Sequence, residues 1–265
     1  MKNGNRRPAA FVLASTDHGP MLVNRLDYRL MNDELIGVGF QLLNKSAYDP
    51  EEVDLVLKLL QARRETCGDG VVAIDCGANI GVHTIEWARL MHGWGEVLAI
   101  EAQERIFYAL VGNITLNNCF NARALWAAVG AYDGTIAVPQ PNYQVPSSFG
   151  SLEIRKRDAT EFIGQDIDYA AAHGRETRML ALDSLALDRL DLVKIDVEGM
   201  EIEALMGAEQ SLARQKPQLV VERIKSNEAD LRAFMARLGY QVFPMGGNLL
   251  AIHASDPTIS LVQAA

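Results

Sequence analysis

The sequence predicts an α/β fold with a mostly parallel sheet, helices on both of its faces and an antiparallel hairpin at one edge. Short apolar runs, which are typical of strands buried on both faces, alternate with longer segments of helical periodicity. Near the end of the chain, two apolar segments flank a Gly246-Gly247 turn, which indicates the hairpin. Together these patterns predict a wrapped parallel sheet with one antiparallel addition.

The composition is that of an ordinary globular protein. Its 265 residues are 49% apolar and 22% charged, enough for one large domain or a domain with an extension. The net charge of −9 argues against a nucleic-acid backbone as the main partner. No run approaches the ~18 apolar residues of a membrane span, and residues 9–14 are too few for the apolar part of a secretory signal. We therefore expect a cytoplasmic protein, of an oligomeric state that the sequence leaves open.

The three cysteines, Cys67, Cys76 and Cys119, form neither a disulfide framework nor a C-x-x-C metal clip. Cys76 lies inside a glycine-rich turn. It is either a small residue that fills a tight space or a reactive thiol.

The first seventy residues are expected to form an extension that covers a pocket. Residues 1–20 have no clear periodicity and are predicted to be irregular, whereas residues 21–40 alternate weakly, as in a short hairpin or edge strands. Asp49-Pro50-Glu51-Glu52 predicts a helix start, followed by inward apolar residues up to about Arg64. We therefore divide the chain into an extension (1–69), a main domain (70–254) and a tail (255–265).

Within the main domain, strands and helices are predicted in alternation. Core strands are expected at residues 71–74, 97–100, 122–129, 179–182, 192–197 and 219–221, and hairpin strands at 240–243 and 248–252. Helices are expected at residues 80–91, 104–117, 198–212 and 227–238. A short antiparallel return is expected at residues 136–138, after the strand at 122–129. The proline-rich segment at 139–176 has no periodicity, and a connection of this length is usually functional or disordered.

The segment after the first core strand reads D-x-G-x-x-x-G, from Asp75 to Gly81. Gly77 and Gly81 allow a tight turn and a close approach of the backbone to a ligand. Asn79 occupies the place of the second glycine of a dinucleotide-binding turn, which favours a nucleoside without a pyrophosphate. The alternative is a strand-to-helix turn in which glycine serves geometry only.

Four acids follow predicted core strands: Asp75, Glu101, Asp196 and Glu222. Because the carboxyl ends of parallel strands share one edge of the sheet, we expect these acids to converge there. Glu101 comes 24 residues after Gly77, at the end of the next strand. An acid at about this spacing accepts hydrogen bonds from ribose hydroxyls in nucleotide-binding units, because one carboxylate can accept from two hydroxyls.

Four stretches together resemble FkbM-type methyltransferases. They are the glycine turn (75–81), Glu101, Ser-Ser-Phe-Gly-Ser-Leu (147–152) and Leu-Val-Lys-Ile-Asp-Val-Glu-Gly-Met-Glu (192–201). Members of this family are class I S-adenosylmethionine-dependent enzymes, best known for O-methylating hydroxyls of polyketides and sugars. The resemblance covers residues 70–253 and implies a Rossmann-like fold with a mostly parallel seven-stranded sheet.

The resemblance also implies roles for particular positions. The turn residues Gly77, Ala78, Asn79 and Gly81 would wrap the methionine part of the cofactor, and Asp75 would support it through the amino group or a water. Glu101 would bind the ribose beside Ala102, and Ala128 and Val129 would lie against the adenine. Asp196 would sit beneath the methyl sulfonium and face the substrate.

For Asp196, and for Glu198 beside it, three roles fit the chemistry. A carboxylate at this strand end can act as the base or orienter of an acceptor hydroxyl. It can also bind the amino group of the cofactor, or hold a divalent cation, which the sequence permits but does not require.

Two basic residues are further candidates for catalysis. Lys194 faces the same way as Asp196 in a core strand, so it is expected to pair with Asp196 or Asp75, or else to reach solvent at the sheet edge. His83 follows the glycine turn and either points toward the methyl-transfer site or is structural.

The segment at 139–176 is the candidate acceptor-binding loop, with Ser147 and Ser148 as substrate contacts together with Glu222. Arg155-Lys156-Arg157 either grips an anionic substrate such as a nucleotide sugar or is a solvated face. Trp126 and Phe149 either line the pocket or belong to the core.

Taken together, we expect an S-adenosylmethionine-dependent methyltransferase that O-methylates a hydroxyl of a sugar, a glycan precursor or a similar small molecule. The alternatives are N-methylation of an amino sugar or peptide, and a non-catalytic nucleoside-binding partner in a glycan-assembly complex.

Overall fold

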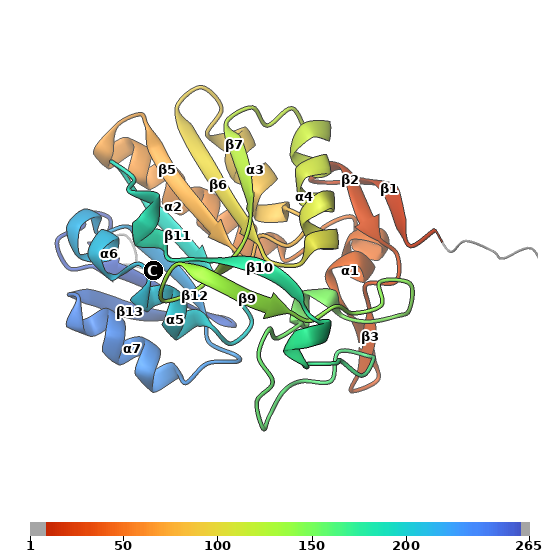
Figure 1. Cartoon of the computed structure of the whole chain (residues 1–265). Helices are drawn as coiled ribbons and strands as arrows, with labels where there is room; N and C mark the ends of the chain where they lie inside the picture. Colours follow the sequence, from red (N-terminus) through yellow and green to blue (C-terminus); the bar gives the residue numbers. More distant parts are fainter. Residues whose placement is uncertain (1–8, 261–265) are drawn as a thin grey trace, which may run out of the picture.

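A seven-stranded sheet forms the centre of the molecule, which is described here by a computed structural model covering residues 9–260 (Figure 1). The strand order is β13-β14-β12-β11-β5-β6-β7, and every neighbouring pair is parallel except those that involve β14. The predicted fold and the edge hairpin are therefore confirmed. The strands are β5 (Val71–Cys76), β6 (Gly95–Glu101), β7 (Ala122–Trp126), β11 (Leu192–Ile195), β12 (Gln218–Glu222), β13 (Tyr240–Met245) and β14 (Asn248–His253).

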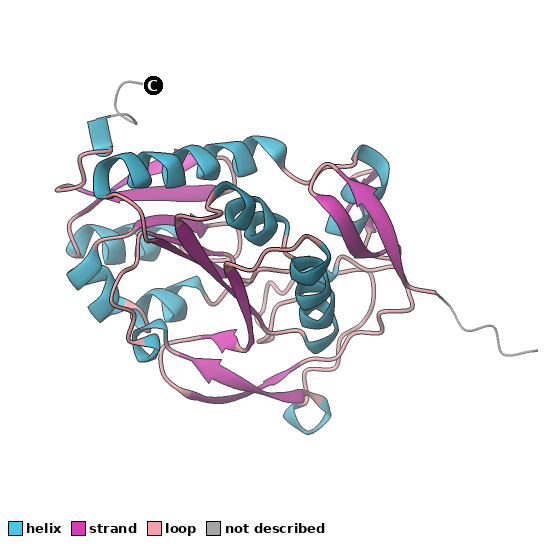
Figure 2. Cartoon of the chain, turned by 90° about the horizontal axis from the view of Figure 1, so that it is seen from above, coloured by secondary structure: helices cyan, strands magenta, loops and turns pink. Residues whose placement is uncertain are grey.

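Helices cover both faces of this sheet (Figure 2). Alternate residues of one strand enter different cores: Ala73 packs with α2 and α3, whereas Ile74 packs on the opposite face with α5, α6 and α7. This two-sided burial is the reason that the core strands are continuous apolar runs. The helices are α2 (Pro50–Cys67), α3 (Val82–Leu90), α4 (Glu104–Leu116), α5 (Glu201–Met206), α6 (Glu209–Gln215) and α7 (Glu228–Arg237).

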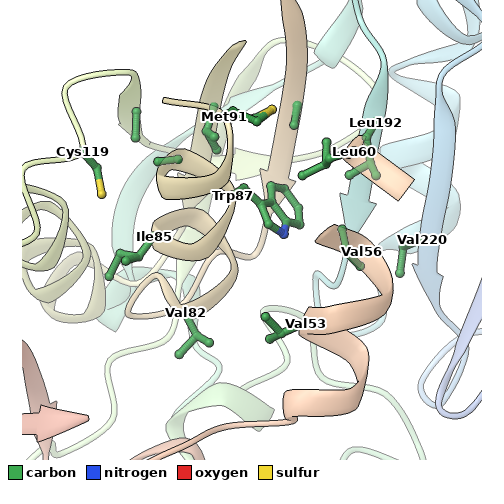
Figure 3. Close-up of a cluster of buried hydrophobic side chains, with 14 of the residues drawn as sticks. Val53, Val56, Leu60, Val82, Ile85, Trp87, Met91, Cys119, Leu192 and Val220 are labelled. Carbon is green, nitrogen blue, oxygen red and sulfur yellow. The ribbon is translucent and has the colours of Figure 1, made fainter. Parts of the chain in front are cut away.

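Trp87 of α3 is the centre of the core beneath α2 (Figure 3). Its side chain is fully buried and lies opposite Val53, Val56 and Leu60, which α2 presents at helical spacing. Helix α2 thus covers one face of the sheet, although it precedes the glycine turn in sequence. Its first turn is held beside the start of α3.

The predicted strand at residues 122–129 is divided in the structure. After β7, the backbone N–H of Ala127 donates to the Glu101 carbonyl at 3.1 Å, and β8 (Ala128–Val129) then leaves the main sheet. It joins a second sheet of order β8-β10-β9, with β9 (Gly134–Val138) and β10 (Arg175–Leu180). The expected antiparallel return exists as β9, but it pairs with β10 and not with the preceding strand.

The predicted helix at 198–212 is also divided, into α5 and α6. Gly207 lies between them, where a Cβ atom would be 2.0 Å from the carbonyl oxygen of Gly130. This close approach of two backbones interrupts the helix. Short 3₁₀ turns complete this half of the chain: η1 (Phe149–Ser151), η2 (Ala171–His173) and η3 (Leu182–Leu185).

The extension is more ordered than the sequence predicts. Residues 11–20 are not irregular: β1 (Phe11–Thr16) and β2 (Gly19–Asn24) form a hairpin, which the Asn113 side chain of α4 holds by accepting from Leu22 N at 2.6 Å. A second hairpin, β3 (Arg29–Met31) with β4 (Glu34–Ile36), is followed by α1 (Val38–Lys45). Residues 1–8 and 261–265, which belong to the predicted extension and tail, lie outside the described residues.

No helix in the described part of the chain is long and apolar enough to cross a membrane.

Candidate active site

A cavity of about 340 Å³ opens at the carboxyl ends of β5, β6, β11 and β12. This is the size of small-molecule sites, and it lies at the edge where α/β sheets bind ligands. One side is formed by the glycine turn, Glu101 and residues 127–129. The other side is formed by the extension (residues 29–48), residues 148–154 and the segment after β12.

The glycine turn brings the backbone after β5 into close contact with the backbone after β11. Gly77 has a φ of 78°, and a Cβ atom there would lie 1.7 Å from the carbonyl oxygen of Asp196, so no side chain fits. The backbone N–H groups of Gly77 and Ala78 both donate to the Ile100 carbonyl, at 2.9 and 3.0 Å. Gly81, by contrast, does not line the cavity. A Cβ atom at Gly81 would lie 2.7 Å from Leu110, so this glycine permits α3 to pack on α4.

Glu101 is buried at the cavity wall in a fixed orientation. Its carboxylate accepts from Asn79 N at 3.0 Å and from Gln103 N at 2.8 Å. Burial raises the pKa of Glu101 to about 7, although these two backbone donors act in the opposite direction. A carboxylate has about four acceptor positions, so two remain for ligand hydroxyls.

Asp75 leaves one acceptor unused. Its Oδ2 accepts from the Thr84 hydroxyl at 2.7 Å, but Oδ1 is buried without a hydrogen-bond partner among the described residues. Asp75 also lines the cavity. An unpaired buried acceptor is unfavourable unless a donor reaches it, so this atom is suited to an ammonium group or a water molecule.

Lys194 and Asp196 form an ion pair at 2.7 Å, as one of the predicted alternatives required. The prediction that Lys194 reaches solvent is wrong, because its side chain is only 5% exposed. Burial alone would lower the pKa of Lys194, but Asp196, Asp75 and Glu52 oppose this and raise it overall.

The turn after β11 brings three carboxylates together. Oxygen atoms of Asp196, Glu198 and Glu222 lie within 4.8 Å of one another. Glu201 holds this turn in place by accepting from Val197 N at 3.1 Å and Gly199 N at 3.0 Å. Oxygen ligands at this separation are of the kind that a divalent cation binds.

Ion pairs with Lys225 and raised pKa values both affect the carboxylates near this turn. Lys225 pairs with Glu198 and, at 3.1 Å, with Glu161. Burial, followed by the charge of Asp196, raises the pKa of Glu222 to about 8 and raises that of Glu198 as well. Burial is the main cause of both shifts, and the neighbouring acidic groups add to it.

His83 lines the cavity from the first turn of α3. Its Nε2 lies 3.2 Å from Glu52 Oε1, and the other oxygen of Glu52 accepts from the Asn248 side chain at 2.7 Å. His83 Nδ1 is buried and has no hydrogen-bond partner in the described chain. Both predicted roles of His83 therefore remain open, but its position at the site is clear.

Ser148 lines the cavity, whereas Ser147 does not. The Ser147 hydroxyl is fully buried and donates to the Pro146 carbonyl at 2.6 Å. The segment is tied to the extension by the Asp27 carboxylate, which accepts from Phe149 N at 2.9 Å and Gly39 N at 3.0 Å. Burial raises the pKa of Asp27 to about 6, against the effect of these two donors.

Two aromatic candidates remain, one in this segment and one at the end of β7. Phe149 is fully buried against Tyr143, and Trp126 donates from Nε1 to the Ala102 carbonyl at 3.0 Å. Neither ring lines the cavity. Cys76 is likewise fully buried, which favours the interpretation of a space-filling residue.

The two arginines of the basic run pair with carboxylates of the chain. Arg155 pairs with Glu203 at 2.9 Å, and Arg157 pairs with Glu153 at 2.7 Å. Both guanidinium groups are thus already matched by carboxylates of the chain itself.

Sequence reasoning missed the site residues that the extension contributes. They are Arg29, Met31, Ile36, Gly37, Val38, Gln41 and Tyr48, with Glu52 behind His83. The only available signal was the acidic helix start at residues 49–52, which was interpreted as capping alone. Its fourth residue also serves the site.

A family model matches most of the main domain. The model of the methyltransferase FkbM domain matches residues 75–242. The chain belongs to the FkbM methyltransferase family. All the predicted site residues of this FkbM domain line the cavity except Gly81 and Ser147.

The chain is similar to several solved methyltransferase structures, at low sequence identity. Methyltransferase FkbM from Methylobacillus flagellatus KT is 18% identical with a TM-score of 0.45, over 70% of this chain and 43% of that one. Precorrin-6y C5,15-methyltransferase from Geobacter metallireducens GS-15 is 17% identical with a TM-score of 0.45, over 79% and 89%. Monomeric WbdD is 10% identical with a TM-score of 0.49, over 82% and 44%. This FkbM chain thus spans less than half the length of the first and third of these proteins, and no curated protein matches it.

Proposed function

We propose that this FkbM domain transfers a methyl group from S-adenosylmethionine to a hydroxyl of a sugar, a glycan precursor or a similar small molecule. The observation that carries the proposal is that one cavity joins Glu101 and the glycine turn to the Lys194–Asp196 pair. A nucleoside-binding half and a carboxylate suited to a hydroxyl therefore face the same space.

The residues of the first half fit the cofactor. Glu101 keeps two acceptor positions free for ribose hydroxyls, and the unpaired Oδ1 of Asp75 suits the ammonium group of the methionine part. The turn at Gly77 brings backbone, without a side chain, to the cavity wall. Ala128 and Val129 are small apolar residues at the wall, suited to contact with adenine.

The second half is suited to holding the acceptor in line. When bound, S-adenosylmethionine supplies an electrophilic methyl group on a sulfonium. Asp196 would accept the hydrogen bond of the acceptor hydroxyl, and its ion pair with Lys194 fixes the carboxylate in place. Holding two reacting groups close and aligned accounts for much of such a rate enhancement, and proton acceptance adds ~10²–10⁴-fold.

N-methylation of an amino sugar or peptide is the second candidate. The excess of carboxylates at Asp196, Glu198 and Glu222 favours it, because an amine acceptor is cationic before it reacts. A methyl-transfer screen with labelled cofactor against neutral sugars and amino sugars separates the two. A non-catalytic nucleoside-binding role would give cofactor binding and no transfer to any acceptor.

Calorimetry with S-adenosylmethionine tests the donor half. We expect saturable binding by the native protein and loss of at least tenfold in affinity for Glu101→Ala, since a carboxylate hydrogen bond contributes about 1.5–3 kcal/mol. Binding that is absent from the native protein, or unchanged in the variant, would refute the donor assignment.

Turnover tests the acceptor half. Asp196→Asn should retain cofactor binding and lose about 10²-fold or more in kcat, because the amide cannot take a proton. Native turnover by Asp196→Asn would show that Asp196 is not the proton acceptor.

A further inference from the structure

Every Lys and Arg side chain that lines the cavity is already paired with a carboxylate. Lys194 pairs with Asp196, Lys225 pairs with Glu161 and Glu198, and Arg29 pairs with Glu161. The three cationic side chains are no more than 10% exposed, whereas Asp196 and Glu161 are 31% exposed. Among the described residues, the cavity therefore offers no unpaired Lys or Arg side chain to a ligand.

Carboxylates outnumber these cations two to one at the wall. Six acids line the cavity, against the three fixed cations: Asp75, Glu101, Glu161, Asp196, Glu198 and Glu222. One oxygen of Glu222 is buried without a hydrogen-bond partner in the described chain. A phosphate or carboxylate entering this space would lose its hydration and meet only cations that are already paired with carboxylates.

The acceptor half also presents aliphatic side chains, beside the polar Gln41, Tyr48 and Ser148. Three aliphatic side chains come from the extension, and three come from elsewhere in the chain: Met31, Ile36, Val38, Leu152, Ile154 and Ile224. Met31 and Ile224 remain 41% and 70% exposed. An apolar group beside the reacting hydroxyl would cover this surface and remove it from water.

We propose that the acceptor is a molecule without an anionic group, which carries an apolar substituent next to its hydroxyl-bearing part. The proposal rests on the methyltransferase function above and narrows its acceptor. It excludes sugars linked to a nucleoside diphosphate or a phosphate, and it favours glycosides of apolar alcohols. The pairing of the cavity's own cations would disfavour an anionic acceptor, and the aliphatic side chains at the wall would favour an apolar substituent.

Three glucosides that differ only on the anomeric oxygen test this. Their substituents are a methyl group, an octyl chain and a phosphate, and binding is measured by calorimetry with the native protein saturated with S-adenosylmethionine. We expect the octyl glucoside to bind at least tenfold more tightly than the methyl glucoside, because each buried methylene adds about fourfold. The phosphate should bind at least tenfold more weakly than the methyl glucoside. Equal affinities, no binding by any glucoside, or tighter binding of the phosphate would each overturn the proposal.

A charge variant tests the cause. Glu161→Gln removes the carboxylate partner of Arg29 and one of the two partners of Lys225. It should improve binding of the phosphate about tenfold relative to the methyl glucoside, through a charge-assisted hydrogen bond. The control is Glu203→Gln, which frees Arg155 outside the cavity and should leave the ratio unchanged. An unchanged ratio in Glu161→Gln would overturn the explanation by paired cations.

These outcomes are distinct from failure of the proposed function. The glucoside titrations are repeated without S-adenosylmethionine, so the ranking is measured even if the cofactor does not bind. A protein that binds and uses the cofactor but prefers the anionic glucoside would retain the proposed function and lose this inference.

Discussion

At the scale of single residues, Glu101 links the site to pH. Burial raises its pKa to about 7 in the free protein, and ribose hydroxyls would donate to its ionised form. Cofactor affinity should therefore rise with pH up to about 7 and then level off. About one pH unit below that value, binding should be about tenfold weaker than at the plateau.

Calorimetry with S-adenosylmethionine from about one pH unit below 7 to above 7 measures this dependence. Glu101→Gln, which is isosteric and does not titrate, should bind more weakly and with a flat profile. An equal pH dependence in Glu101→Gln would assign the titration to another group.

Glu52 is expected to fix the tautomer of His83. His83 Nε2 lies 3.2 Å from Glu52 Oε1, so the neutral imidazole should carry its proton on Nε2. Nδ1, which has no hydrogen-bond partner among the described residues, should then be unprotonated. Two-dimensional ¹H–¹⁵N spectra of the imidazole should show this single tautomer in the native protein and a mixture in Glu52→Ala. The matched control is Glu51→Ala, an exposed acid of the same helical turn. An Nε2-protonated ring in Glu52→Ala would mean that Glu52 does not orient His83.

At the scale of elements, the contact between α2 and α3 depends on Trp87. This fully buried ring packs against α2, so Trp87→Ala should lower the free energy of unfolding by about 3–5 kcal/mol, measured by chemical denaturation. Val111→Ala on the exposed side of α4 is the control, with an expected change within about 0.5 kcal/mol. A small effect of Trp87→Ala would mean that α2 is held mainly by its other contacts.

The elements that the sequence predicted best are those whose apolar residues are buried on both faces of the sheet. In β12, for example, Val220 is buried on one face of the sheet and Leu219 and Val221 on the other, and the position of the strand follows from that pattern. The division at Ala127 was not predictable, because residues 124–129 are all apolar while the backbone changes sheets. Likewise, nothing local in the helix at 198–212 indicates that Gly207 approaches Gly130, which is distant in sequence.

The same distinction holds for the site. Glu101 and Asp196 follow strand ends, and parallel topology alone brings them together. Arg29 reaches the cavity, and Glu52 reaches His83, through packing of the extension, which no periodicity specifies. Gly81 was interpreted as a ligand contact for its place in a motif, although its close neighbour is Leu110.

At the scale of the whole molecule, the extension and the main domain share one core. Val53, Val56 and Leu60 cover a face of the sheet, and Arg63 pairs with Asp191 at 3.2 Å and Asp256 at 2.7 Å. We therefore predict that the full chain unfolds in one calorimetric transition with equal calorimetric and van't Hoff enthalpies. A separate transition for residues up to 69 would instead support an independent extension.

Part of the cavity wall lies inside the region that the family model matches, and part of it lies before that region. The family match begins at Asp75, whereas Arg29, Met31 and Tyr48 lie before it and close the acceptor side. Classification by the matched domain therefore sorts such proteins by the methyl donor they share. We predict that exchanging residues 29–48 between two members with nearly identical matched regions exchanges the acceptors that they methylate.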